Sequence, residues 1–169
     1  LPEIAIEYFD DALILRKKYL QAVSMRNCLE GIVNTVFVHI AEAHETAGNW
    51  KKKNLYKRID SLKDFLHPSV LEAIQSIRKV TNKGAHQDGH KNLTEEELEE
   101  ALASLHKVCE WIIISYIKKN GFHTESWTPT VLSTLRPIYR VRILEELYDF
   151  VQGDTEICEQ LLEYLESVQ

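Results

Sequence analysis

Hydrophobic residues recur three and four positions apart along almost the whole of this chain. This spacing places apolar side chains on one face of an α-helix, whereas a half-buried β-strand would show strict alternation. No alternating run bounded by hairpin turns is present, and only 6 Gly and 4 Pro interrupt the pattern. The pattern therefore predicts an all-α protein with a core of four to five helices.

Helix-breaking residues divide this pattern into seven predicted helices. Pro2 suits an opening turn, Gly48 and Asn49 follow the second helix, and His67-Pro68 separates the third helix from the fourth. The predicted ranges are about 2–19, 21–47, 51–65, 69–84, 94–119, 131–151 with a break at Pro137, and 154–167.

The fifth predicted helix has the clearest boundaries. Thr94 and Glu97 form a capping-box pattern, in which each side chain binds the backbone N–H of the other residue. Basic residues and a glycine are typical of the opposite end of a helix, and here they are Lys118, Lys119 and Gly121.

The most apolar stretch of that helix is "WIIISYI", residues 111–117. A helix that is apolar around most of its circumference is either central to its own bundle or shared with a second subunit, and both readings stay open here. We expect a helical bundle over residues 1–120. A C-terminal helical appendage over 121–169 is expected to pack on the same domain.

Composition indicates a soluble globular protein. The chain has 169 residues, of which 44% are hydrophobic and 27% charged. No apolar run approaches the ~20 residues that cross a bilayer, and the N-terminus lacks the regions of a signal peptide. We therefore expect a cytoplasmic protein without membrane contact. The three widely separated cysteines suit neither a disulfide framework nor a zinc site: Cys28, Cys109 and Cys158.

The net charge of -6 argues against a protein that coats nucleic acid nonspecifically, because such binding depends on Lys and Arg. One local basic cluster remains. It is either an ordinary solvated helix face or a surface that contacts nucleic-acid phosphates. Its residues are Lys51, Lys52, Lys53, Lys57 and Arg58.

The segment "IRKVTNKGAHQDG", residues 77–89, carries the strongest candidate chemistry. Arg78, Asn82 and His86 are spaced four apart, which places them on one polar stripe of a helix. We expect Gly84 and Gly89 to release the backbone, so that the helix ends near Gly84 and His86 lies at a partly exposed mouth beside Arg78 and Asn82. The opposite stripe is expected to face the core: Ile74, Ile77 and Val80.

A purely structural role for the same residues stays open. In that reading, Arg78 pairs with a carboxylate on an adjacent helix, for which Glu30 is the candidate, and Asn82 and His86 tie down the helix end. A metal site is the other alternative, because His86, Asp88 and His90 could ligate zinc. Gly84 and Gly89 indicate a loop, so the spacing of these residues does not place them on one face of a helix. We expect no metal and no cofactor.

Four segments, in this order, resemble an uncharacterised prokaryotic branch of the HEPN superfamily. Members of that branch typically carry an "R..LE" segment, a "L...I..L" segment and then "IR..GN.aaH". The resemblance implies an up-and-down helical bundle, often a homodimer, in defence-related proteins that include fusions to restriction-enzyme subunits. Between Ala22 and Lys119, the matching segments are "MRNCLEGIVN", "NLYKRIDSL", "IQSIRKVTNKGAH" and "TEEELEEALASLHKVCEWII".

The resemblance also implies a chemistry. Active members of the superfamily are metal-independent ribonucleases whose motif is an arginine, four to six residues, then a histidine. Here Thr81 stands directly before Asn82, where that arginine is expected, and seven residues separate Arg78 from His86. In an active protein, His86 would be the acid or base, Arg78 the phosphate clamp oriented by Glu30, and Asn82 an orienting group, at a groove between two subunits.

Two functional hypotheses follow. The first is a noncatalytic HEPN-like module of a defence or toxin-type protein that binds nucleic acid, a partner protein or a fused domain. The second is a metal-independent endoribonuclease that uses His86. The missing arginine favours the first.

Overall fold

The computed structural model describes residues 8–9, 18–36, 47–85, 93–120, 135–150, 158–159, 162 and 166. Within these residues every regular element is a helix and there is no strand, so the predicted all-α fold is confirmed. By its internal contacts the chain divides into two compact units, Leu1–Val108 and Cys109–Gln169.

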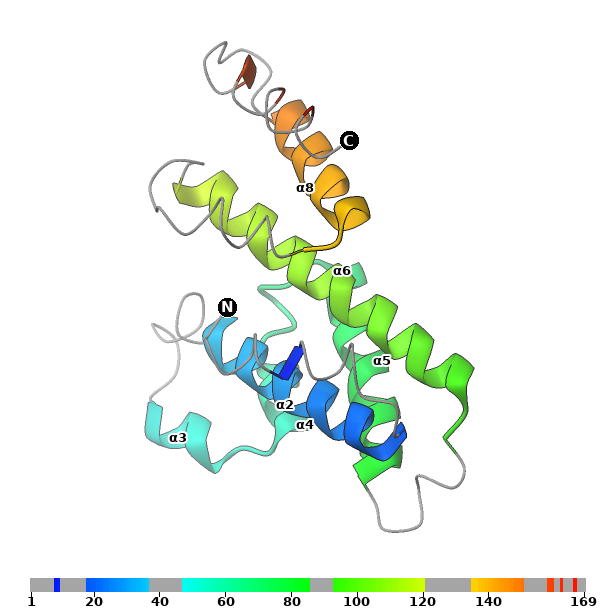
Figure 1. The fold of residues 1–169 in the computed structure, drawn as a ribbon. Coiled ribbons are helices and arrows are strands. Elements are labelled where there is room, and N and C mark those ends of the chain that lie inside the picture. Colours follow the sequence, from blue (N-terminus) through cyan, green and yellow to red (C-terminus); the bar gives the residue numbers. More distant parts are fainter. Residues whose placement is uncertain are drawn as a thin grey trace. The chain divides into compact units, whose positions relative to one another are not determined.

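In the described part of the first unit, the longer elements are α2 to α5 and the beginning of α6 (Figure 1). The predicted helix over 69–84 is confirmed as α5, which begins and ends one residue outside that range. The predicted helix over 51–65 is instead two short helices, because the side chain of Asn54 accepts a hydrogen bond from the Lys57 N–H at 3.0 Å and caps the second of them. The elements are α2 (Lys18–Val36), α3 (Ala47–Lys52), α4 (Leu55–Ser61), α5 (Pro68–Ala85) and the part of α6 (Glu95–Asn120) through Val108.

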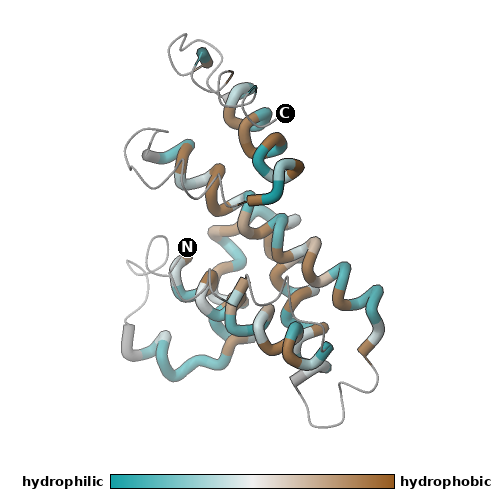
Figure 2. The backbone as a smooth tube through the Cα atoms, in the orientation of Figure 1, coloured by the Kyte–Doolittle hydropathy of each residue, from teal (hydrophilic) through white to brown (hydrophobic). Residues whose placement is uncertain are grey.

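The core of this unit lies where α2, α4 and α5 contact one another. Hydrophobic and hydrophilic stretches follow one another along these helices (Figure 2). Such a distribution lets a helix turn an apolar face toward the core. The side chains that are almost completely buried are Met25, Leu29, Ile32, Ile59, Leu62, Ile74, Ile77 and Leu105.

The core-facing stripe of α5 differs from the predicted one at its end. Ile74 and Ile77 are buried as expected, but Val80 is only half-buried, and Thr81 is completely buried in its place. Positions 74, 77, 81 and 84 follow the three-four-three spacing that keeps one helix face against the core. Thr81 is therefore a core position and not a surface position.

Gly84 lies at the contact of α5 with α2. A methyl group at this position would collide with the Cβ of Ala22 and lie 3.2 Å from Leu93 Cδ2. Gly84 is the second-last residue of α5, so the helix ends near Gly84 as predicted, and the expected release of the backbone after it lies outside the described residues. Its missing side chain allows the two helices to approach closely.

The predicted capping box at the start of α6 is confirmed. The Thr94 N–H donates to Glu97 Oε2 at 3.0 Å, and the Glu97 N–H donates to Thr94 Oγ1 at 3.1 Å. Lys83 Nζ also donates to both carboxylate oxygens of Glu97, at 2.8 and 2.7 Å. Glu97 therefore connects the last turn of α5 to the first turn of α6.

These contacts predict a pH dependence of stability. The hydrogen bond from Lys83, and secondarily that from the Thr94 backbone, lowers the pKa of Glu97 below its ordinary value of 4.5. A lowered carboxyl pKa stabilises the fold above the ordinary value, and this stabilisation is lost as the pH falls through the folded-state pKa. Between pH 7 and pH 3, we expect the melting temperature of Glu97→Gln to fall less than that of wild type. The exposed Glu99 on the same helix provides the control, and an equal effect of Glu99→Gln would contradict this assignment.

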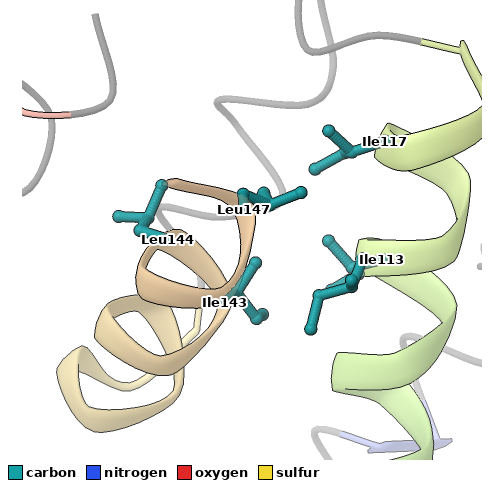
Figure 3. Packing of buried hydrophobic residues seen from close by; sticks show 6 residues of the cluster. Ile113, Ile117, Ile143, Leu144 and Leu147 are labelled. Carbon is teal, nitrogen blue, oxygen red and sulfur yellow. The ribbon is translucent and has the colours of Figure 1, made fainter. Parts of the chain in front are cut away.

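The second unit contains the end of α6 and α8 (Pro137–Phe150). Of the predicted helix over 131–151, residues 135 and 136 are not helical and α8 begins at Pro137, whereas residues 131–134 lie outside the described residues. Figure 3 shows side chains of the two helices pointing toward one another. The apolar run "WIIISYI" thus contributes to a core within its own chain, and the homodimer remains a prediction. The buried residues are Ile113, Ile114, Ile117, Ile143, Leu144 and Leu147.

This contact also places the division of the chain at Val108–Cys109 instead of the predicted residue 120, because the last turns of α6 pack with α8. Of the predicted helix over 154–167, residues 158, 159, 162 and 166 are described, and they are helical. No helix in the described part of the chain is long and apolar enough to cross a membrane.

Candidate nucleic-acid interface

Polar side chains from α2 and α5 form two hydrogen-bonded groups, which are together called the polar strip. On α5, Gln75, Arg78 and Asn82 follow one another at intervals of three and four residues, which places them on the same helix face. On α2, Arg26 and Glu30 are one turn apart. Arg26 contacts Glu30 and Asn82, and Arg78 contacts Gln75.

Arg26 connects the two helices at one end of the polar strip. Its Nη1 donates a hydrogen bond to Asn82 Oδ1, and its Nε donates to Glu30 Oε1 at 3.2 Å. The side chains of Arg26 and Glu30 are 33% and 39% exposed, so water screens this ion pair and its contribution to stability is small. Because Glu30 carries the opposite charge, Arg26 presents little net charge to a ligand.

Arg78 has a different environment. Its Nε donates to Gln75 Oε1 at 2.9 Å, and its guanidinium carbon lies 5.0 Å from the ring centre of Tyr56 on α4. Both partners are uncharged, so they orient the guanidinium without neutralising it. Arg78 therefore presents an ordered, half-exposed positive charge.

These positions correct one sequence-based assignment. Glu30 was expected to pair with Arg78, but it pairs with Arg26, and the ion pairs of the described residues do not include Arg78 with Glu30. Asn82 likewise contacts Arg26. His86, with Asp88, Gly89 and His90, lies outside the described residues, so its expected place beside Arg78 and Asn82 remains a prediction.

Sequence reasoning missed Arg26 as a member of this cluster. The signal was present, because Arg26 and Glu30 stand four residues apart in "RNCLE", the spacing at which opposite charges meet on a helix. Only the packing of α2 against α5 reveals that Asn82 is the second partner.

The five cations of the predicted basic patch divide into two groups. Two of them pack on Trp50, which is buried, since Lys53 Nζ lies 6.0 Å and the Arg58 guanidinium carbon 5.9 Å from its ring centre. Arg58 Nη1 also donates to Asn34 Oδ1 at 3.2 Å, and Lys53 Nζ donates to Ser61 Oγ at 2.6 Å. These two side chains hold α3 and α4 in place.

The other three cations are exposed to solvent, and they are Lys51, Lys52 and Lys57. They belong to the most basic part of the chain. Residues 47–85 contain nine Lys and Arg against three Asp and Glu, a net charge of +6. The remaining residues contain eleven basic and twenty-three acidic side chains, a net charge of -12. The chain therefore contains a basic segment although its overall net charge is -6, and a polyanion would bind preferentially to this segment.

The described residues hold no cluster of His, Cys, Asp or Glu that could bind a metal ion. Cys28 is equally unsuited to chemistry, because burial raises its pKa to about 12 and keeps the thiol protonated. The arrangement can therefore bind an anion through oriented and exposed cations.

Comparisons with known proteins identify one family. A family model, the domain of unknown function DUF4145, matches residues 12–134, which include the polar strip and all of α2 through α6. No curated protein matches the chain, and no solved structure does. Because the match covers most of the 169 residues, this chain belongs to the DUF4145 family.

Proposed function

We propose that this chain is a HEPN-like helical domain of a prokaryotic defence or toxin-type protein, and that it binds RNA without cleaving it. The observation that carries the proposal is the environment of Arg78. Arg78 is held by Gln75 and Tyr56 and pairs with no carboxylate among the described residues, so its charge is available to a phosphate.

The charge distribution supports the same proposal. Lys51, Lys52 and Lys57 are exposed in the basic segment that also contains Arg78. Lysines and arginines that neutralise phosphates release counterions, and this release supplies most of the affinity of proteins for nucleic acid. The order of the four HEPN-like sequence segments, together with the all-α fold, supports the family part of the proposal.

A noncatalytic role fits the two positions that an active site of this kind would need. Thr81 occupies the place of the expected arginine and is completely buried. Arg26, the other arginine near Asn82, is neutralised by Glu30. Neither position supplies an uncompensated guanidinium beside Asn82.

The second candidate is a metal-independent endoribonuclease. Asn82 and Arg78 lie on one face of α5, and this face favours the candidate if His86 continues it. In that reaction His86 would take the proton of the ribose 2'-hydroxyl, or donate one to the departing 5'-oxygen, while Arg78 stabilises the charge on the phosphate. A homodimer would place two copies of this face at one groove.

Binding is tested by fluorescence anisotropy with a labelled 20-nucleotide single-stranded RNA in EDTA. We expect the logarithm of the affinity to fall linearly with the logarithm of the salt concentration, because each neutralised phosphate contributes a slope of about -0.7. Affinity that does not change with salt would contradict binding through these cations. No binding at low salt would favour a protein partner or fused domain instead.

The same samples distinguish the two candidate functions. After incubation with single-stranded and transfer RNA, we expect wild type and His86→Ala to leave the RNA equally intact. Cleavage by wild type that is absent in folded His86→Ala would establish the ribonuclease, and cyclic-phosphate ends would identify the 2'-hydroxyl route. Light scattering of both proteins reports whether the homodimer exists.

A further inference from the structure

We infer that Tyr56 is a platform on which an unpaired RNA base stacks, so that the ligand of this surface is single-stranded RNA. The inference rests on the proposed function and adds the class of RNA and the residue that would contact a base. It is carried by the position of an exposed aromatic ring beside an oriented cation.

Tyr56 is one of the most exposed large hydrophobic residues in the described part of the chain. It lies on α4 and is 52% exposed, although aromatic rings are usually buried in a core or an interface. Arg78 lies over one face of the ring, 5.0 Å from its centre. Arg78 therefore contacts the ring while about half of Tyr56 stays exposed.

The contact with Arg78 limits the freedom of both side chains. Gln75 binds Arg78 Nε at 2.9 Å, so the guanidinium is held between the amide of Gln75 and the ring of Tyr56. A ring that is already ordered loses less side-chain entropy when a base stacks on it. The same guanidinium remains available to a phosphate of the nucleotide whose base is stacked.

This combination favours a single strand over a duplex. In a duplex the bases are stacked on one another, and their faces are not accessible to a side chain. Single-stranded nucleic acid exposes these faces, and proteins bind it through aromatic stacking next to basic residues. Lys57 follows Tyr56 directly in the sequence and is exposed, so α4 also carries a cation that a phosphate of the same strand could contact.

The test compares two RNA strands that have the same number of phosphates. One is a 12-nucleotide strand with bases, and the other carries abasic spacers at every position. For wild type, we expect the strand with bases to bind between about fivefold and about a hundredfold more tightly, the range given by stacking on one aromatic side chain. Tyr56→Leu should reduce this ratio to about 1, whereas Tyr56→Phe, which keeps the ring, should preserve it. Thermal melting confirms that both variants are folded.

The ratio separates stacking from effects on charge. If Tyr56→Leu left the ratio of the two affinities unchanged, the inference would be wrong. Equal weakening of both strands would then mean that the ring acts only by orienting Arg78. Salt-dependent binding by wild type would still leave the proposed function intact. If wild type bound neither strand, the proposed function would fail and the inference with it.

Discussion

Replacing Thr81 with arginine is expected to destabilise the protein by about 3–5 kcal/mol, the cost of leaving a buried charge without a partner. Thr81 is completely buried beside the core residue Ile77 on α5. Under the proposed HEPN-like assignment, this position is the one at which an active ribonuclease is expected to carry its arginine. The introduced guanidinium would have to enter the apolar contact between α5 and the core, or α5 would have to rotate. The measurement is urea unfolding followed by circular dichroism.

Thr81→Val serves as the matched control. It has the same shape and loses only the hydrogen bond from Thr81 Oγ1 to the Arg78 carbonyl oxygen, which is 3.3 Å long. We expect a change of at most about 1 kcal/mol. If Thr81→Arg were as stable as Thr81→Val, position 81 could turn to solvent, and the structural reason for the missing arginine would be lost.

Local sequence signals predicted the helix boundaries that depend on neighbouring residues. Thr94 and Glu97 cap α6 through atoms that are three residues apart, and Pro137 begins α8, where its missing N–H would have no partner inside the helix. The break after α3 was not predicted, although Asn54 is a typical N-cap residue, because the apolar spacing continues across it without a Gly or Pro.

Contacts between helices could not be predicted in the same way. Helical spacing indicates which residues share a face, so Arg78 and Asn82 were placed correctly on one side of α5. It does not indicate which residue of the neighbouring helix lies opposite, and Glu30 was consequently assigned to the wrong arginine. Gly84 is a similar case, because its close contact with Ala22 depends on where α2 crosses α5.

The predicted basic patch illustrates the difference between sequence and structure most clearly. The spacing of its five cations gave no reason to distinguish them. Packing on Trp50 engages Lys53 and Arg58, and so leaves the three exposed lysines as the candidates for contact with phosphates. A functional variant should therefore change the exposed lysines and leave the two structural cations in place.

Simultaneous replacement of Lys51, Lys52 and Lys57 by alanine tests most directly whether RNA binds the basic segment. At about 0.1 M salt we expect affinity for single-stranded RNA to fall roughly a hundredfold, and the salt slope to decrease by about 2, since each lost phosphate contact removes about 0.7. The three side chains are exposed, so the fold should be unaffected.

The control variant replaces three exposed cations outside this segment, which are Lys107, Lys119 and Arg136, and it changes the net charge by the same amount. We expect its affinity for RNA to stay within a few-fold of wild type. Equal weakening in both variants would show that RNA responds only to the total charge. Wild-type affinity in the lysine variant would contradict the proposed binding surface.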